Sequence, residues 1–384
     1  MEFYKKNIIP LLRPLAAVFI VISAFFALST CQRVEENDFV LDMAAAEIPQ
    51  PESIPAPERY VNLNLKERPE AEPEYVYSGP TNPLTGLPVD EEIHMNRPIA
   101  VIISNIREAT PHVGISRADI IYETLVEGGI TRMLLLFQDS SRVTTLGSVR
   151  SARTYFVDIA QSYDAILIFA GGSPQAYAEI RNRGITHLDG VGGRAEIFYR
   201  DRGRERTMGF VHSLVTTGTL LTQWLPQYGF RLEHEDGYVR NLRFSDYAAP
   251  ENGGEALTFS VNFSSSKSTT FRFNQERGLY YVSQHGGPLV DGLNSTQIAA
   301  TNILILRAPV SGVPGDREGR LIINTVGTGS GYFVNGGKYI EIEWSRADNN
   351  AQFEYTLLDG SPLILGRGLT YICIIPTTVD VDFG

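Results

Sequence analysis

Two short segments of the chain carry residue types that bind anions where a strand gives way to a helix. Residues 147–153 read Gly-Ser-Val-Arg-Ser-Ala-Arg, which places Arg150 and Arg153 three positions apart, and residues 171–173 read Gly-Gly-Ser. Unpaired backbone N–H groups and the positive end of the helix dipole favour negative charge at such a junction. A guanidinium also holds carboxylate or phosphate with two parallel hydrogen bonds, which a lysine ammonium does not. These segments therefore predict an anion-binding site.

The same side chains could instead stabilise the fold. Arg150 and Arg153 could pair with carboxylates in an internal network, and Ser173 could act only as the cap of the following helix. Arg132 fits either interpretation, and both stay open on the sequence alone. The residues of the candidate ligand site are Arg132, Arg150, Arg153, Gly171, Gly172, Ser173, Glu123, Glu127, Asp158 and His212.

A serine on a sharp turn also raises the prospect of a hydrolase, which needs a base and an orienting acid. Ser173, His212 and Asp158 or Asp189 supply these residue types. Pro174 removes a backbone N–H that would help form an oxyanion hole, and Ser173 lies in no GxSxG elbow, so capping is its favoured role. As an alternative, a hydrolase of wall glycan or ester could use carboxylates as acid and base. Its candidates are Glu123, Glu127 and Asp158.

Composition excludes several classes of function. The 384 residues include 33 basic and 44 acidic side chains, giving a net charge of -11, which argues against a nucleic-acid partner. The six histidines are scattered without metal-ligand spacing, and the two cysteines, Cys31 and Cys373, are too few for a zinc or iron–sulfur site. We therefore expect no metal and no cofactor.

The first thirty residues have the order of an export signal. Basic residues precede an uncharged apolar run over residues 15–28. A membrane-spanning helix needs about 20 apolar residues, so a cleaved signal is favoured over a transmembrane helix. Leu28-Ser29-Thr30-Cys31 resembles a bacterial lipobox, although Thr30 stands where Gly, Ala or Ser is usual. We expect lipidation at Cys31 and an extracytoplasmic protein held to a bacterial membrane by that lipid.

Residues 31–80 are predicted to be a tether. The segment is rich in proline and in acidic residues, with few bases. Proline interrupts helices and like charges repel, so the segment should stay extended.

Residues 81–245 are predicted to form an α/β domain. Apolar runs at 98–103, 132–137 and 165–170 predict buried strands, and helices are expected over 118–126, from a Ser151 cap to 163, over 175–182 and over 214–228. This alternation predicts a mixed or mainly parallel sheet with helices on both faces. Since such a sheet gathers its strand-to-helix junctions at one edge, the two anion-binding segments should be neighbours.

Residues 246–384 are predicted to form a β-rich domain of short alternating strands. The glycine-rich stretch 327–331 is expected to be a hairpin turn rather than a nucleotide loop. Tyr280, Tyr281, Trp344 and Tyr355 could stack on sugar rings, but ordinary sheet packing is favoured.

Several stretches together resemble the YerB-like lipoproteins, a bacterial family of unknown function with N- and C-terminal domains. The resemblance runs from about Asn82 to the C-terminus, and the chain departs from it at Ser213, where an asparagine is expected after His212. The stretches that carry it are 97–101, 118–123, 126–132, 147–153, 163–165, 171–174, 300–306 and 366–376.

We therefore expect an exported, lipid-anchored protein of the cell envelope that binds an anionic envelope ligand or peptide. Its partners would be the membrane, through the lipid, and a cell-wall component or an envelope protein. A wall hydrolase and a partner or regulator of envelope synthesis enzymes are the alternatives, the last of which an exposed apolar patch on the β-rich domain would support.

Overall fold

A computed structural model describes residues 79–192, 194 and 196–384. The predicted signal, Cys31 and nearly all of the tether lie outside the described residues. The described residues belong to one compact unit, Glu58–Gly384. Within them, no helix is long and apolar enough to cross a bilayer.

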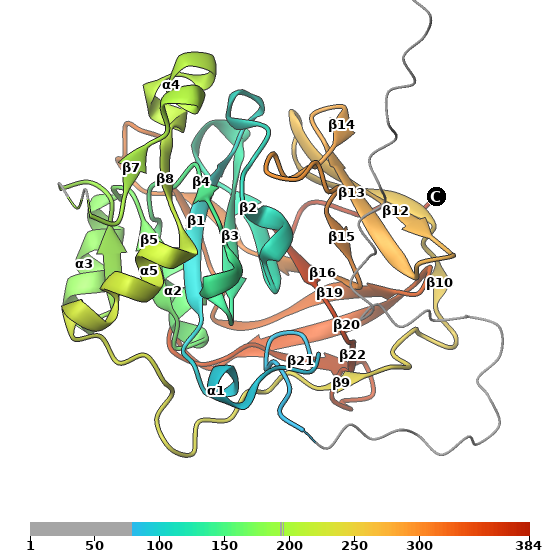
Figure 1. The fold of residues 1–384 in the computed structure, drawn as a ribbon. Helices are drawn as coiled ribbons and strands as arrows, with labels where there is room; N and C mark the ends of the chain where they lie inside the picture. The colour runs from blue at the N-terminus through green and yellow to red at the C-terminus, as the bar shows by residue number, and fades with distance from the viewer. Residues whose placement is uncertain (1–78, 193, 195) are drawn as a thin grey trace, which may run out of the picture. The chain divides into compact units, whose positions relative to one another are not determined.

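A large mixed sheet forms the centre of the fold (Figure 1). Strand β1 pairs in parallel with β5 and antiparallel with β3, and β2 pairs in parallel with β23, so the prediction of a mixed sheet is confirmed. From one edge to the other the strands are β10 (Gly254–Glu255), β20 (Lys338–Arg346), β19 (Gly327–Asn335), β16 (Asn302–Ala308), β23 (Thr370–Pro376), β2 (Ile120–Leu125), β3 (Thr131–Phe137), β1 (Ile99–Asn105), β5 (Ile166–Phe169) and β6 (His187–Asp189), with β21 (Glu354–Leu357) beside β20.

Smaller sheets and short helices surround this centre. Helices α2 and α3 contact one another, and α2 packs on β5; that helices cover both faces of the sheet stays a prediction. The helices are α1 (Glu91–His94), α2 (Thr154–Ser162), α3 (Pro174–Arg183), α4 (Arg202–Met208) and α5 (Gly218–Trp224), with 3-10 turns η1 (Arg107–Ala109), η2 (Ile115–Arg117), η3 (Glu127–Gly129), η4 (Ser140–Arg142), η5 (Phe210–His212) and η6 (Pro226–Tyr228). The remaining strands are β4 (Leu146–Gly147), β7 (Tyr199–Arg200), β8 (Leu214–Thr216), β9 (Phe244–Ser245), β11 (Thr258–Ser264), β12 (Lys267–Asn274), β13 (Leu279–Gln284), β14 (Gly287–Pro288), β15 (Ala299–Ala300), β17 (Val310–Gly312), β18 (Leu321–Ile323) and β22 (Leu365–Gly366).

The central strands are buried along their whole length. Every residue of β1 and of β2 is buried, as expected for near-continuous apolar strands covered on both faces. Strand β23, from the end of the chain, lies between β2 and β16, and Ile121 faces Tyr371 across the pair. The sheet is therefore continuous between the first and second regions, while the limits at 80 and 245 stay predictions.

Two predicted helices are wrong. Residues 118–126 form strand β2 instead, because Ile120, Ile121 and Tyr122 favour a pleated strand and β3 and β23 flank them. Residues 214–228 divide into strand β8, helix α5 and the turn η6, since Thr217 caps α5 and Pro226 interrupts the helix.

Two further details of the prediction are wrong. Helix α2 begins after Arg153 rather than Ser151, because the backbone before it is held extended against the 171–173 turn. Residues 327–331 start strand β19 rather than forming a turn. A Cβ at Gly329 would overlap the Trp344 ring, and one at Gly331 would overlap the Ile305 carbonyl, so close approach explains these glycines.

Candidate anion-binding site

The two predicted junctions lie side by side at the carboxyl ends of β1 and β5. The backbone N–H of Arg150 donates to the carbonyl of Ile102 at 2.8 Å, and the N–H of Ala170 donates to the carbonyl of Arg150 at 3.0 Å. Two residues later, Ala152 pairs with Gly172. The backbone of residues 150–152 is therefore hydrogen-bonded between β1 and the end of β5. The side chains of Arg150 and Arg153 lie at this edge of the sheet.

Arg150 has no ion pair among the described residues. Its Nη1 donates to the carbonyl oxygen of Val211 at 3.2 Å. Burial lowers the pKa of Arg150 from its ordinary value, and the charges of Arg200 and Arg153 lower it further. A half-buried cation beside other cations lacks negative charge, and an incoming anion would supply it.

Arg153 is paired with Glu127. The contact is bidentate, with Nη2 of Arg153 donating to Oε2 of Glu127 at 2.8 Å and Nε donating to Oε1. Burial alone would raise the pKa of Glu127, but the hydrogen bonds and charge of Arg153 outweigh it and hold that pKa below its ordinary value of 4.5. Arg153 is therefore part of an internal ion pair, which is one of the two roles that the sequence allowed for it.

We expect Arg153→Ala to lower the free energy of unfolding at pH 7 by about 1–3 kcal/mol, because Glu127 loses a charge-assisted bidentate partner. A carboxyl whose folded pKa is depressed contributes stability above its unfolded pKa and loses it as the pH falls through the folded pKa. The difference between wild type and variant should therefore shrink as the pH falls below 4.5. Urea unfolding between pH 7 and pH 3 measures this difference, and a constant value across that range would contradict the assignment.

Arg132 completes the group from the start of β3. Its Nη1 donates to the carbonyl of Ser151 at 2.7 Å. Burial lowers the pKa of Arg132 to about 10, with Arg153 also lowering it and Glu127 opposing the shift. Glu127 therefore acts on two of these guanidinium groups, those of Arg132 and Arg153. We call Arg132, Arg150, Arg153 and Arg200, together with Glu127, the arginine cluster.

The second junction, residues 171–173, contributes its backbone to the site, because the Ser173 hydroxyl is already used as a helix cap. Gly171 has a φ of +72°, which glycine adopts without strain, and its N–H donates to Oδ1 of Asp189 at 2.8 Å. Ser173 accepts from the N–H of Ala176 at 3.1 Å and is buried, so it caps α3 as the sequence indicates. Gly172 pairs with Ala152 and holds the Arg150 segment in place.

Glu123 and Asp158 lie apart from this cluster. Glu123 is 0% exposed and binds side chains from other strands rather than an arginine. Asp158 pairs with Arg183 of α3, and burial raises its pKa despite that partner. Of the predicted carboxylates, the structure therefore brings only Glu127 to the arginines.

His212 lies close enough to Arg150 for the charges to interact. It is 9% exposed, and within the described part of the chain its Nδ1 has no hydrogen-bond partner. Burial lowers its pKa below the ordinary value, and Arg150 lowers it further, which favours the neutral imidazole at pH 7. Asp189 binds Gly171, and Asp158 binds Arg183, so neither acid orients His212 as a catalytic base.

Sequence reasoning did not find Arg200 and its neighbour Phe210. The Arg200 guanidinium lies 3.6 Å from the Phe210 ring centroid and donates to the Phe210 carbonyl. Phe210 and Val211 are 60% and 50% exposed, so the cations stand beside apolar surface. The basic run over residues 200–206 was the available signal.

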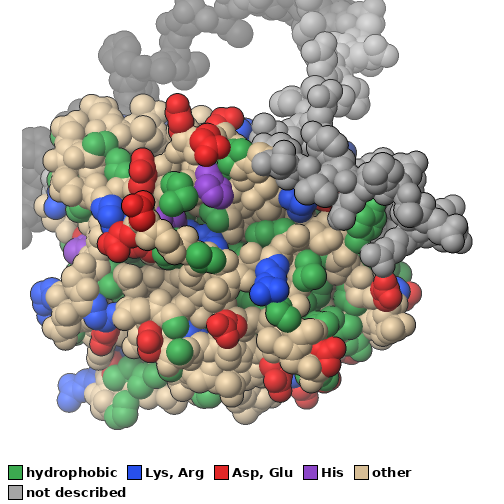
Figure 2. Space-filling model, turned by 90° about the horizontal axis from the view of Figure 1, so that it is seen from below, with side chains coloured by type: hydrophobic (Ala, Val, Ile, Leu, Met, Phe, Trp, Pro, Cys, Tyr) green, Lys and Arg blue, Asp and Glu red, His purple; other side chains and the backbone are tan. Residues whose placement is uncertain are grey.

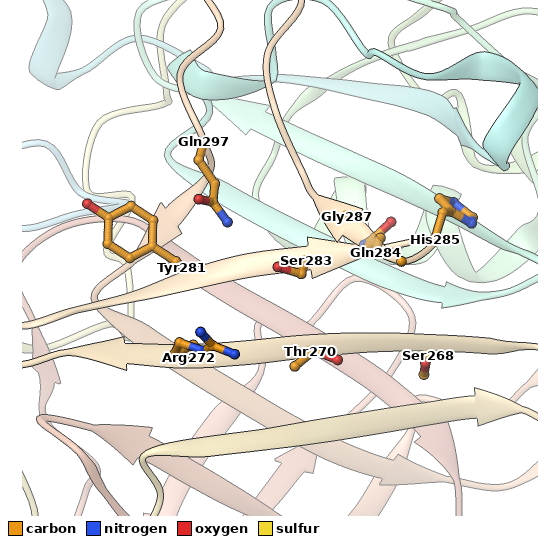
Figure 3. A pocket seen from close by; sticks show the side chains of 10 residues that line it. Ser268, Thr270, Arg272, Tyr281, Ser283, Gln284, His285, Gly287 and Gln297 are labelled. Carbon is orange, nitrogen blue, oxygen red and sulfur yellow. The ribbon is translucent and has the colours of Figure 1, made fainter.

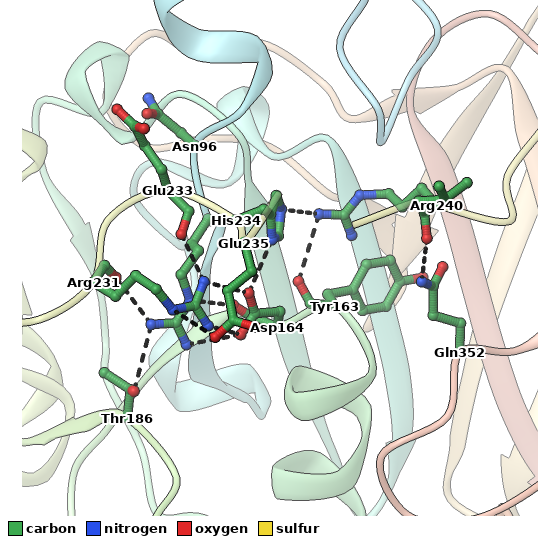
Figure 4. A network of polar contacts seen from close by, with 12 residues as sticks. Asn96, Tyr163, Asp164, Thr186, Arg231, Glu233, His234, Glu235, Arg240 and Gln352 are labelled. Carbon is green, nitrogen blue, oxygen red and sulfur yellow. Dashed lines mark hydrogen bonds and ion pairs between the residues drawn. The ribbon is translucent and has the colours of Figure 1, made fainter. Parts of the chain in front are cut away.

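A second group of arginines at the amino ends of the same strands shows the contrasting case (Figure 4). Oxygens of Asp164 accept from Arg231 at 2.7 and 2.8 Å and from His234 at 2.9 Å, with Arg97 at 3.2 Å. Burial by itself raises the pKa of Asp164, but His234 and the arginines bring it down to about 2. These arginines already have their anion, whereas Arg150 does not.

The comparisons with known proteins indicate one family over most of the chain. Residues 84–231 match the family described as "Protein of unknown function (DUF3048) N-terminal domain", and residues 259–372 match the corresponding C-terminal domain. The chain is 30% identical over 303 residues to "Putative lipoprotein YerB" of Bacillus subtilis (strain 168), covering 78% of this chain and 86% of that protein. The crystal structure of the YerB protein from Bacillus subtilis matches with a TM-score of 0.68 at 28% identity, covering 77% of this chain and 96% of that one. These matches confirm the resemblance found in the sequence.

Proposed function

The chain belongs to the DUF3048 family that includes YerB, and on that premise we propose that it is an exported, lipid-anchored envelope protein that binds an anionic ligand through the arginine cluster. The description of the Bacillus subtilis relative as a lipoprotein supports the anchor, as does the lipobox-like sequence ending at Cys31. An anchor of this kind keeps a protein at the outer face of a membrane, where wall polymers and envelope proteins are its neighbours.

The observation that carries the binding proposal is the unpaired charge of Arg150. Glu127 is committed to Arg153, and the Arg132 guanidinium donates to a carbonyl. Among the described residues, Arg150 donates only to a carbonyl oxygen, and Arg200 contacts a carbonyl oxygen, the Ser213 hydroxyl and the Phe210 ring, with no carboxylate on either. In a chain with a net charge of -11, this local excess of positive charge favours an anion over other ligands.

The ligand class is a phosphate-bearing polymer or a peptide carboxylate. Guanidinium groups bind both with short, charge-assisted hydrogen bonds. The exposed Phe210 and Val211 next to the cations could add apolar contact to a peptide.

The two alternative functions have less support. A hydrolase needs two facing carboxylates, but Glu123 and Asp158 are bound to other residues and do not face Glu127. A regulator of synthesis enzymes would use an exposed apolar patch, but hydrophobic side chains on the face shown in Figure 2 are scattered among polar and charged ones.

Arg150→Ala should weaken anion binding about tenfold, the loss expected for one charge-assisted hydrogen-bonding group. Fluorescence anisotropy with a labelled polyphosphate and with a labelled acidic peptide measures the affinity and separates the two sources of negative charge. Arg202→Ala, an exposed arginine at the start of α4, is the matched control. Equal loss in both variants, or no binding of either probe by the wild type, would refute the proposal.

A further inference from the structure

A polar cavity of about 450 Å³ lies on the five-stranded sheet of β11, β12, β13, β14 and β15, and no residue of the arginine cluster lines it (Figure 3). Its walls include Ser268, Thr270 and Arg272 on β12, Tyr281 and Ser283 on β13, and Gln297 from the segment before β15. The volume falls within the roughly 300–1,000 Å³ of small-molecule sites.

Buried apolar residues alternate with exposed polar ones along β12 and β13, which makes one face of this pair of strands polar. On β12, Phe271 is buried while Arg272 is exposed, and on β13, Val282 is buried between two half-exposed residues. The register places Arg272 opposite Tyr281 and Thr270 opposite Ser283. Successive residues of a strand point to opposite faces, so the polar set shares the solvent face.

Most of these polar groups have no partner within the protein. Among the described residues, the side chains of Ser268, Arg272, Tyr281 and Ser283 form no hydrogen bond or ion pair. The amide nitrogen of Gln297 donates to the carbonyl of Val282 at 2.9 Å, which turns one end of that side chain toward the sheet. The cavity therefore offers hydroxyl donors and acceptors, the Arg272 guanidinium, the Tyr281 ring and, at one end, the His285 imidazole.

We infer that this cavity binds an oligosaccharide that carries a carboxylate. Sugar hydroxyls match the serine, threonine and tyrosine hydroxyls, since each both donates and accepts. The flat face of Tyr281 fits the apolar C–H face of a sugar ring, whereas Tyr280, Trp344 and Tyr355 are buried in the core.

Charge selects the acidic class of sugar. Among the residues that the structure describes, no acidic side chain lines the cavity, and the Arg272 guanidinium has no partner. A neutral sugar would leave that guanidinium without a counter-charge, and a lipid chain would leave the hydroxyl groups without hydrogen bonds. A sugar that carries a carboxylate beside Arg272 meets both needs, since the carboxylate pairs with the guanidinium and the sugar hydroxyls bond to the protein hydroxyls.

An array of carboxylated oligosaccharides and neutral oligosaccharides of equal length tests the inference on the full chain. The wild type should bind carboxylated members above their neutral counterparts. Arg272→Ala should weaken that binding about tenfold and remove the preference, and Tyr281→Ala should weaken binding to both classes. Arg277→Ala, an exposed arginine on the turn after β12, should bind like the wild type.

Circular dichroism of each variant separates loss of the site from loss of the fold. The loss of binding in Arg272→Ala reports on this cavity whether or not the arginine cluster binds an anion, so this test is independent of that cluster. The inference is overturned if no carboxylated glycan binds above background, if neutral glycans bind equally well, or if folded Arg272→Ala and Tyr281→Ala bind like the wild type.

Discussion

Replacing Glu123 with alanine should lower the free energy of unfolding by about 3–5 kcal/mol, the cost of breaking a buried charged network at one partner. The Glu123 carboxylate is 0% exposed, and Nζ of Lys267 lies 3.4 Å from its Oε1. Without the carboxylate, the buried ammonium of Lys267 loses its counter-charge. The hydrogen-bond donors that also lose their acceptor are Asn105, Thr131, Thr269, Gln284 and Tyr371.

Urea unfolding followed by tryptophan fluorescence measures this loss. Glu276→Ala, which removes an exposed carboxylate, should change the free energy of unfolding by no more than about 0.5 kcal/mol. The double variant Glu123→Met with Lys267→Met should recover only part of the loss, because it removes the unpaired charge but leaves the five donors without their acceptor. A single Glu123→Ala variant as stable as the wild type would contradict the account of this network.

Replacing Cys31 with alanine should abolish acylation of the chain completely, because a lipobox offers its thiol as the only attachment point. Metabolic labelling with a clickable fatty acid, in a bacterium that processes lipoproteins, reads the modification directly. The wild type should be labelled, should fractionate with the membrane, and should lack residues 1–30 by mass. Cys31→Ala should carry no label.

Cys373→Ala is the matched control for the other cysteine, since Cys373 is wholly buried in β23 and has no access to the acylating enzyme. It should keep the label and the membrane fraction. The lipid anchor would be contradicted by label on Cys31→Ala, or by an unlabelled wild type that retains residues 1–30 as a spanning segment.

Local sequence pattern predicted most of the strands, because long apolar runs such as residues 99–103 are buried wherever they pair. It failed for β2, which reads equally well as a short helix until its partner is known. One of its two partners, β3, follows it directly in the chain, but the other, β23, lies 250 positions away, where the Thr124 hydroxyl donates to the Ile374 carbonyl. No pattern within residues 118–126 could have revealed this pairing.

The candidate site could be predicted only in part from the sequence. Gly172 follows the parallel strand β5, as expected, whereas Arg150 follows β4, which pairs with β8 outside the central sheet; the two segments are neighbours because Ala152 pairs with Gly172. The choice of Glu127 rather than Glu123 as the arginine partner depends on the turn after β2. That turn brings Glu127 to the edge, while Glu123 stays in the buried body of the strand.

Nuclear magnetic resonance of the arginine Nε–H groups tests the central claim most directly. During titration with inorganic phosphate, and separately with acetate, the Arg150 resonance, assigned by its loss in Arg150→Ala, should shift and saturate. The Arg202 resonance should stay in place. An Arg150 resonance that does not move, or one that moves only in step with every exposed arginine, would show that this guanidinium receives no bound anion.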